Sequence, residues 1–289
     1  MSLKFVYGAS ASGKSQKLYE EVLSEASKCL NKRYVFIVPE QYALSVEKNL
    51  VDKSEGHGII NIEVLSFSRL SYRIMEEAGD VVLPKLNDVG KTVLLRNIIE
   101  EKDSELRLYK SKKNNLGFLD ELKSMISEMS QYLIAPDFVK AASDSAPENT
   151  LMKLKLSELS VIYSEYNKRL SEMGFTTAEN IIELCFKHIT DSEFLSGTTL
   201  VFDGFTGFTP IQYEFIERLM MKNCDFIFSL TGDDGIFMPY KRESDSGRDL
   251  FAMSHEMADK LIRLSEKNGI KTEVAVRTDY VSGTDARKS

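Results

Sequence analysis

The chain has 289 residues, of which 43% are apolar and 28% charged, the profile of a globular protein with one large domain or two. Its formal net charge of −7 excludes a generally basic protein that coats nucleic acid, so any contact with DNA has to come from local basic patches. Three widely spaced cysteines exclude a disulfide framework, and no apolar run approaches the roughly 20 residues of a membrane span, so we expect a cytoplasmic protein without a membrane partner.

The first fifteen residues carry a phosphate-binding pattern. An apolar run at residues 4–7 leads into G-x-x-x-x-G-K-[ST], here Gly8, Ala9, Ser10, Ala11, Ser12, Gly13, Lys14 and Ser15. Convergent backbone N–H groups, a helix N-terminus and one long cation can hold the crowded charges of a nucleoside triphosphate. Lys14 can reach the β- and γ-phosphates, and the Ser15 hydroxyl can ligate Mg²⁺. These eight residues are the predicted ATP site.

A P-loop needs a strand before the pattern and a helix after it, and both are predicted here. Residues 15–29 carry apolar or amphipathic side chains at helical spacing, namely Leu18, Tyr19, Val22, Leu23 and Ala26. The alternative interpretation is a Gly/Ser turn between strand and helix that binds nothing.

Strands then alternate with helices. The apolar run at 33–38, stopped by Pro39, predicts a strand buried on both faces of a parallel sheet. A helix at 41–51, a strand at 59–66 and a helix at 67–77 follow. This alternation predicts a doubly wound α/β domain.

From about residue 87 to residue 195 the pattern is helical throughout. Apolar side chains recur in four stripes, which begin at Val89, Phe118, Leu151 and Ile181. The polar segment 141–150, which contains a proline, is predicted to be a loop. We therefore expect an all-helical insertion.

The α/β pattern returns with a strand at 198–202, a helix that begins near Pro210, a strand at 224–230, a helix at 254–268 and a strand at 271–276. The expected division is a P-loop domain over 1–86 and 196–281, an insertion at 87–195 and a polar tail at 282–289 that resembles a truncated linker.

A P-loop is normally completed by an aspartate at the tip of a hydrophobic strand, which supports the Mg²⁺ beside the β- and γ-phosphates. Asp203 takes that position, so Ser15 and Asp203 are the predicted magnesium residues, although a turn aspartate explains the same pattern. Helicase-type motors usually place next a glutamate that activates water, and this chain has Gly204. We therefore expect nucleotide binding with little or no hydrolysis.

Related motors also carry a G-D-x-x-Q run after the next strand, whose glutamine reads the γ-phosphate. Here Gly232 and Asp233 begin such a run, and Ile236 stands in place of the glutamine. An Asp-Asp-Gly turn explains the same residues.

Five stretches in this order resemble the N-terminal part of the AddB subunit of the AddAB helicase–nuclease. They are the P-loop at 8–15, Val-Pro-Glu-Gln at 38–41, Val-Leu-Ser-Phe-Ser-Arg-Leu at 64–70, Phe-Asp-Gly-Phe at 202–205 and Phe-Thr-Pro-Ile-Gln at 208–212. The resemblance covers nearly the whole chain.

The resemblance implies a RecA-like, superfamily-1 helicase domain interrupted by a 1B-like helical subdomain. It further implies a complex with an AddA-like helicase/nuclease subunit that resects double-strand breaks for recombinational repair, in which the AddB subunit is a degenerate motor that holds single-stranded DNA. A second helicase-like domain and the nuclease would lie beyond residue 289, so no nuclease residue can be assigned here and no nuclease activity is expected of this chain.

DNA in such motors touches the turns after the second and third strands. The residues there with suitable polar, cationic or stacking groups are Gln41, Ser66, Phe67, Arg69 and Arg73. Equally, Phe67 belongs to a core, and Arg69 and Arg73 form a solvated i, i+4 face.

Two other functions stay open at this point. One is an autonomous P-loop kinase or phosphotransferase with the insertion as a lid, for which Arg96, Arg107 and Arg169 are the available phosphate-closing arginines. The other is an assembly scaffold that binds no nucleotide.

Overall fold

The computed structural model describes residues 1–54, 60–233, 250–273 and 276–278. The chain forms two compact units, each described here by itself. An α/β unit comprises Met1–Gly79, Cys185–Phe208 and Tyr213–Ser289, and a helical unit comprises Asp80–Leu184 and Thr209–Gln212. The contacts divide the chain earlier at both boundaries than the expected division at 86/87 and 195/196.

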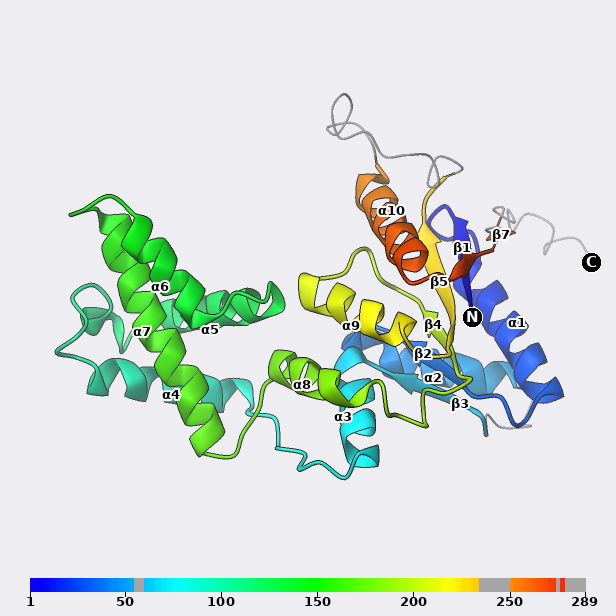
Figure 1. Ribbon diagram of the computed structural model, residues 1–289, viewed down its shortest axis with the longest axis horizontal. Coiled ribbons are helices and arrows are strands. Elements are labelled where there is room, and N and C mark those ends of the chain that lie inside the picture. The colour runs from blue at the N-terminus through cyan, green and yellow to red at the C-terminus, as the bar shows by residue number, and fades with distance from the viewer. Residues whose placement is uncertain (55–59, 234–249, 274–275, 279–289) are drawn as a thin grey trace, which may run out of the picture. The chain divides into compact units, whose positions relative to one another are not determined.

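The described part of the α/β unit contains one sheet of seven strands, in which every pairing is parallel (Figure 1). The order is β3-β2-β4-β5-β1-β6, and β7 also pairs with β1. The strands are β1 (Ser2–Gly8), β2 (Tyr34–Ile37), β3 (Ile62–Leu65), β4 (Thr199–Phe202), β5 (Asp225–Thr231), β6 (Lys271–Thr272) and β7 (Val276–Arg277). An α/β fold with an all-parallel sheet and a helical insertion is thus confirmed.

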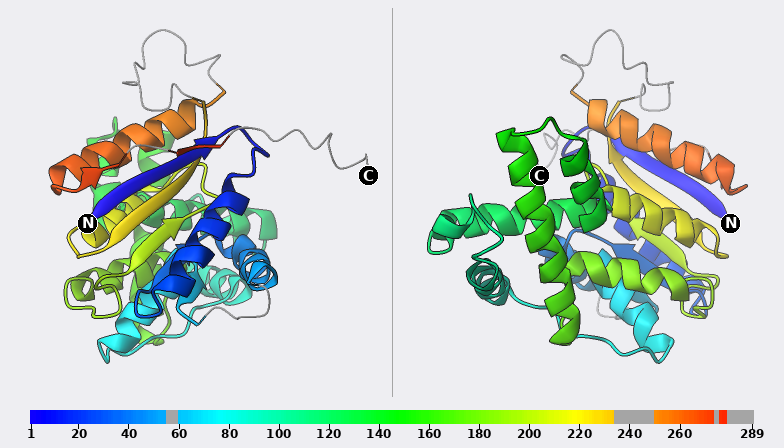
Figure 2. Two further views of the ribbon diagram at one scale, coloured as in Figure 1. Left: turned by 90° about the vertical axis from the view of Figure 1, so that its right-hand side faces the viewer. Right: turned by 60° about the vertical axis from the view of Figure 1, so that its left-hand side comes forward.

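Helices cover both faces of this sheet. They are α1 (Lys14–Lys28), α2 (Ala43–Lys53), α3 (Phe67–Glu77), α9 (Pro210–Met220) and α10 (Ala252–Lys267). In Figure 2 the blue α1 lies on one side of the sheet, and the yellow α9 and orange α10 lie on the other. Because both faces are covered, the strands are apolar on both sides: Val6, Phe36 and Val201 pack with residues of α1 and α2.

The opposite face of the sheet is built from phenylalanines. Phe202 of β4 stacks on Phe228 of β5 with ring centroids 4.5 Å apart. Phe67, the first residue of α3, lies 5.6–6.0 Å from four other rings, among them Phe205 and Phe208 of the loop after β4. This aromatic cluster fixes the start of α3 against the loop that carries Asp203.

The helical unit contains α4 (Asp88–Glu101), α5 (Leu116–Gln131), α6 (Pro136–Ser145), α7 (Leu151–Glu172) and α8 (Ala178–Cys185). Its core joins buried leucines, isoleucines and tyrosines of α4, α5 and α7, with Leu95, Ile98 and Ile162 fully buried. No helix within the described ranges is both long and apolar enough to cross a membrane.

The predicted loop at 141–150 is wrong in its first half. Residues 141–145 belong to α6, which begins with Pro136 at its first turn. Only Val139 and Ser143 of α6 are buried, and the Ser143 hydroxyl donates to the Lys153 carbonyl of α7 over 2.9 Å. Because most of α6 faces solvent, its composition is as polar as that of a loop. The turn begins at Ala146 and contains Asn149, whose φ is 59°.

The predicted strands at 59–66 and 271–276 differ most from the structure. β3 covers residues 62–65 of the predicted 59–66, and residue 59 itself lies outside the described ranges. The predicted strand at 271–276 is represented by β6 and β7, with residues 274–275 outside the described ranges.

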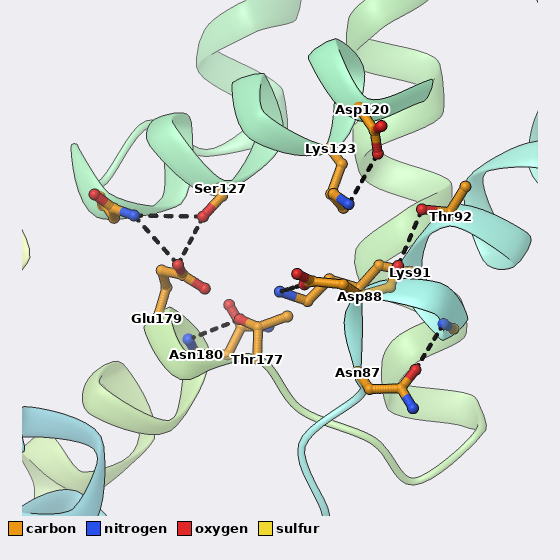
Figure 3. A network of polar contacts seen from close by, with 12 residues as sticks. Asn87, Asp88, Lys91, Thr92, Asp120, Lys123, Ser127, Thr177, Glu179 and Asn180 are labelled. Carbon is orange, nitrogen blue, oxygen red and sulfur yellow. Dashed lines mark hydrogen bonds and ion pairs between the residues drawn. The ribbon is translucent and has the colours of Figure 1, made fainter. Parts of the chain in front are cut away.

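A polar network ties α5 to the start of α8 within the helical unit (Figure 3). One oxygen of Glu179 accepts hydrogen bonds from Ser127 over 2.7 Å and from Gln131 over 3.3 Å. Burial alone would raise the pKa of the Glu179 carboxyl, but these hydrogen bonds and the charge of Lys91 hold that pKa below its usual range. Glu179 therefore stays ionised inside the unit.

Glu158 of α7 is a fully buried carboxylate of the helical unit, whereas Glu179 is half-buried. Its two oxygens accept hydrogen bonds from the backbone N–H groups of Arg107, Leu108 and Tyr109 at 2.7–3.1 Å. With 2% of its surface exposed, this side chain satisfies the backbone of a segment that belongs to no helix.

We expect Glu158→Gln to destabilise the helical unit by about 1.5–3 kcal/mol, because an amide can present only one oxygen to the three donors. Denaturant unfolding and amide hydrogen exchange at residues 107–109 would measure the loss. Glu172→Gln, at a side chain with 60% of its surface exposed, is the matched control and should leave both readouts unchanged.

Candidate functional site

The loop between β1 and α1 turns sharply through left-handed backbone. Gly13 has φ 78°, and Ala11 has φ 61°. The Ser12 N–H donates to the Ala9 carbonyl over 3.2 Å, which closes the turn before α1 begins. Because all strands of the sheet are parallel, the loop lies at the same edge as the segments that follow β2, β3, β4 and β5.

Lys14 folds back onto this loop. Its side chain is largely buried, and Nζ donates to the Ala9 carbonyl oxygen over 2.7 Å. Burial lowers the pKa of the Lys14 ammonium, and the negative charge of Asp203 partly opposes that effect. The loop thus brings one poorly solvated cation to the edge of the sheet.

Asp203 is reached by two hydroxyls from α1. Ser15 Oγ donates to Asp203 Oδ1 over 3.1 Å, and the Tyr19 hydroxyl donates to Asp203 Oδ2 over 2.9 Å. The backbone N–H of Asp203 donates to the Ile37 carbonyl over 3.1 Å, which continues the pairing of β4 with β2. Only 4% of Asp203 is exposed, so the carboxylate is held inside the protein by these partners.

The fold therefore brings Asp203 to the adjacent residues Lys14 and Ser15, although Asp203 and Ser15 are 188 positions apart in the chain. A hydroxyl and a carboxylate oxygen 3.1 Å apart, beside the loop between β1 and α1, are the hard oxygen donors that Mg²⁺ prefers. No group of three or more His, Cys, Asp or Glu side chains able to hold a metal occurs in the part of the chain that the structure describes. Two protein donors fit an ion that also takes phosphate and water oxygens.

Gly204 has a backbone conformation that suits glycine. Its φ is 79°, and a Cβ at this position would lie 3.5 Å from Pro39 Cδ and 3.7 Å from Tyr42 Cδ2. A glutamate here would adopt a strained backbone, although the space around its Cβ is ordinary. The residue after Asp203 supplies no carboxylate to orient water.

Thr278 is a contact of the loop that sequence reasoning missed. Its backbone N–H donates to the Tyr7 carbonyl over 2.8 Å, and its hydroxyl lies 2.9 Å from the Ser12 hydroxyl. Both hydroxyl-bearing side chains are buried. No local signal marks Thr278, because it meets the loop only through the pairing of β7 with β1.

Of the predicted G-D-x-x-Q run after β5, the structure describes Gly232 and Asp233. The Gly232 N–H donates to the Gly8 carbonyl over 3.1 Å, which joins the end of β5 to the loop. Asp233 Oδ1 lies 3.5 Å from Nε2 of His255 in α10. Ile236, in the place of the glutamine, lies outside the described residues.

Two of the five predicted DNA residues have structural roles. Ser66 caps α3, with its Oγ accepting from the Arg69 N–H over 3.3 Å. Phe67 is 5% exposed inside the aromatic cluster, so its ring cannot stack on a base while α3 keeps this position.

The other three predicted DNA residues are exposed. The Arg73 guanidinium lies over the ring of Phe194, 5.2 Å from its centroid. Gln41 lies in the short 3₁₀ turn after β2, and Arg69 on the first turn of α3. Of the five predicted DNA residues, Gln41 and Arg69 therefore have the side chains most available to contact a nucleic acid.

Comparison with known proteins identifies relatives over nearly the whole chain. The family described as "ADDB, N-terminal" matches residues 5–288. The chain is 35% identical over 281 residues to an ATP-dependent helicase/deoxyribonuclease subunit of Lachnoclostridium phytofermentans, covering 96% of this chain and 24% of that protein. It is 33% identical over 275 residues to the subunit of the same name from Clostridioides difficile, covering 94% and 23%. The chain thus spans about a quarter of these relatives.

Gly8→Ala should destabilise the α/β unit by about 1–3 kcal/mol, because small-to-large substitutions in filled space force the backbone to shift. The added Cβ would lie 2.6 Å from the Thr278 carbonyl oxygen and 2.7 Å from Ser12 Oγ. Thermal unfolding would measure the effect. Gly207→Ala is the control, since among the described residues its Cβ would meet only Met253 Cε, at 3.8 Å. Equal stability of the two variants would contradict the close approach at Gly8.

Proposed function

The chain belongs to the AddB N-terminal family, and from that membership we propose that it is the nucleotide-binding, DNA-handling domain of a helicase/exonuclease subunit that acts in double-strand break repair by recombination. In this proposal the domain is degenerate as a motor. The relatives' name, which describes a subunit of an ATP-dependent helicase/deoxyribonuclease, supports the setting.

The convergence of Lys14, Ser15 and Asp203 carries the proposal. Parallel strands place the loop after β1 and the residue after β4 at one edge of the sheet, and α1 brings Ser15 within 3.1 Å of Asp203. In the proposal, the residues from Gly8 to Ser15 bind the ATP phosphates through their backbone N–H groups. Lys14 leaves the Ala9 carbonyl to meet the β- and γ-phosphates.

Magnesium fits the same site. Ser15 and Asp203 would hold Mg²⁺, which when bound would neutralise phosphate charge. Because Gly204 brings no carboxylate, none of these residues serves as a base for the attacking water. We therefore propose binding of Mg-ATP with little or no turnover and no nuclease activity in this chain.

The architecture proposed for this function is a RecA-like, superfamily-1 type domain over 1–86 and 196–281 with a 1B-like helical insertion at 87–195. The order β3-β2-β4-β5-β1 and the phosphate loop after β1 support that type. The word "subunit" in the relatives' name supports an AddA-like helicase/nuclease partner, and single-stranded DNA is the proposed nucleic-acid ligand.

The kinase alternative has no supporting observation among the described residues. Its arginine Arg169 is already engaged, because it bonds Glu165 over 2.9 Å and pairs with Glu101 in the helical unit.

The isolated chain should bind ATP in the presence of Mg²⁺ and hydrolyse it barely above buffer. Lys14→Ala should weaken binding about 10- to 100-fold, because hydrogen bonds to charged groups contribute about 1.5–3 kcal/mol. Isothermal calorimetry would measure the affinity. Lys17→Ala removes an exposed lysine from the same helix and should change little. No binding by the parent would favour the scaffold, and robust turnover without a partner chain would contradict the role given to Gly204.

Single-stranded DNA should bind weakly and with strong salt dependence, because a protein of net charge −7 meets phosphate only through local patches. Arg69→Ala should lower affinity and reduce the slope of log affinity against log salt by about 0.7, the value for one lost phosphate contact. Arg73→Ala should have a smaller effect, since that guanidinium packs on Phe194.

Electrophoretic shifts over a salt series would test this prediction. Arg263→Ala, which removes an arginine with 73% of its side chain exposed on α10, is the matched control. Tight binding at physiological salt, or equal losses in all three variants, would place the strand on another surface.

A further inference from the structure

Tyr19 lies outside the phosphate-binding pattern but contacts the same carboxylate as Ser15. It follows Ser15 by four residues in α1, so both side chains leave the helix on one face. The Tyr19 hydroxyl donates to Asp203 Oδ2 over 2.9 Å, and Ser15 Oγ donates to Oδ1 over 3.1 Å. Two hydroxyls of one helix therefore occupy both oxygens of Asp203.

The phenol is held in a fixed position. Tyr19 has 5% of its surface exposed, and its ring meets Phe36 of β2 edge-on, with centroids 5.4 Å apart and planes at 81°. Asp203 is anchored from the other side by its backbone bond to the Ile37 carbonyl. Since Tyr19 and Asp203 are both buried and held in place, the hydrogen bond between them determines how the Asp203 carboxylate is rotated.

That rotation matters for a metal. A serine hydroxyl that ligates Mg²⁺ through its oxygen can still donate its proton to Asp203, provided that Oδ1 keeps facing Ser15. The bond from Tyr19 to Oδ2 holds the carboxylate in that orientation. Without this hydroxyl, Oδ2 would be left in a buried position lacking the partner it has here.

We propose that Tyr19 is a positioning residue of the magnesium site, aligning Asp203 for the ion shared with Ser15. This inference rests on the proposed Mg-nucleotide function. Tyr19 does not touch the nucleotide; it acts through Asp203, as outer partners of metal-ligating carboxylates do.

Tyr19→Phe tests the proposal because it keeps the ring against Phe36 and removes only the hydroxyl. A fluorescent ATP analogue held at a fixed low concentration is titrated with Mg²⁺, and its binding is also measured in EDTA. The Mg²⁺ concentration for half-maximal binding should rise about 10- to 100-fold, as expected for the loss of an outer-shell partner. Binding in EDTA should stay as in the parent.

The matched control is Tyr34→Phe. Tyr34 is also buried, and its hydroxyl also donates to a carboxylate, Glu25 Oε2, over 3.3 Å. It begins β2, at the opposite edge of the sheet from Asp203, so its removal should cost stability without moving the Mg²⁺ midpoint. Thermal unfolding of both variants separates stability from metal alignment.

The outcomes are distinct. An unchanged Mg²⁺ midpoint in Tyr19→Phe, with Mg²⁺-dependent binding in the parent, overturns this inference and leaves the proposed function standing. Equal losses with Mg²⁺ and in EDTA show a purely structural role and also overturn it. No binding of the analogue by the parent overturns the proposed function and this inference together.

Discussion

A carboxylate buried at the end of a central strand is the constraint on which the candidate site depends. An ionised group with 4% exposure is tolerated only where hydrogen bonds replace its water. For Asp203 those bonds come from Ser15 and Tyr19 of α1, the helix that begins at Lys14. The need to satisfy one acidic side chain thus fixes α1 against β4, and with it the position of the loop that precedes the helix.

Most of the candidate site could be predicted because its pattern is local. The eight residues of the loop, and an aspartate after an apolar strand, have signatures within a few positions of themselves. The sequence identifies Tyr19 only as one member of an amphipathic helical stripe. Its contact with Asp203 could not be predicted, because the hydrogen bond joins residues 184 positions apart. Thr278 had no local signal at all, and the burial of Phe67 follows from rings that belong to three other elements.

For the fold as well, features with a local sequence pattern could be predicted, and features that depend on long-range contacts could not. Continuous apolar runs predict the parallel strands, and apolar side chains at helical spacing predict the long helices. The prediction of a loop at 141–150 is wrong in its first half because α6 buries only two of its residues. With so few buried positions, the sequence of α6 shows little apolar periodicity of the helical kind. At Gly204 the sequence shows that a carboxylate is missing, and the structure adds that the backbone itself has a φ of 79°. A glutamate restored there would also have to accommodate that strain.

The pairing of β1 has a consequence for the order of folding. Both sides of this first strand are occupied by strands from the last quarter of the chain, β5 on one side and β6 and β7 on the other. During synthesis, the loop between β1 and α1 therefore leaves the ribosome long before the strands that flank β1 exist, whereas Asp80–Leu184, which makes up nearly all of the helical unit, is continuous in the chain. The helical unit is the natural first folding unit. The candidate site joins Ser15 of α1 to Asp203 across 188 positions, so it cannot form before the strand β4 has been made, and closing so long a loop carries a large entropic cost.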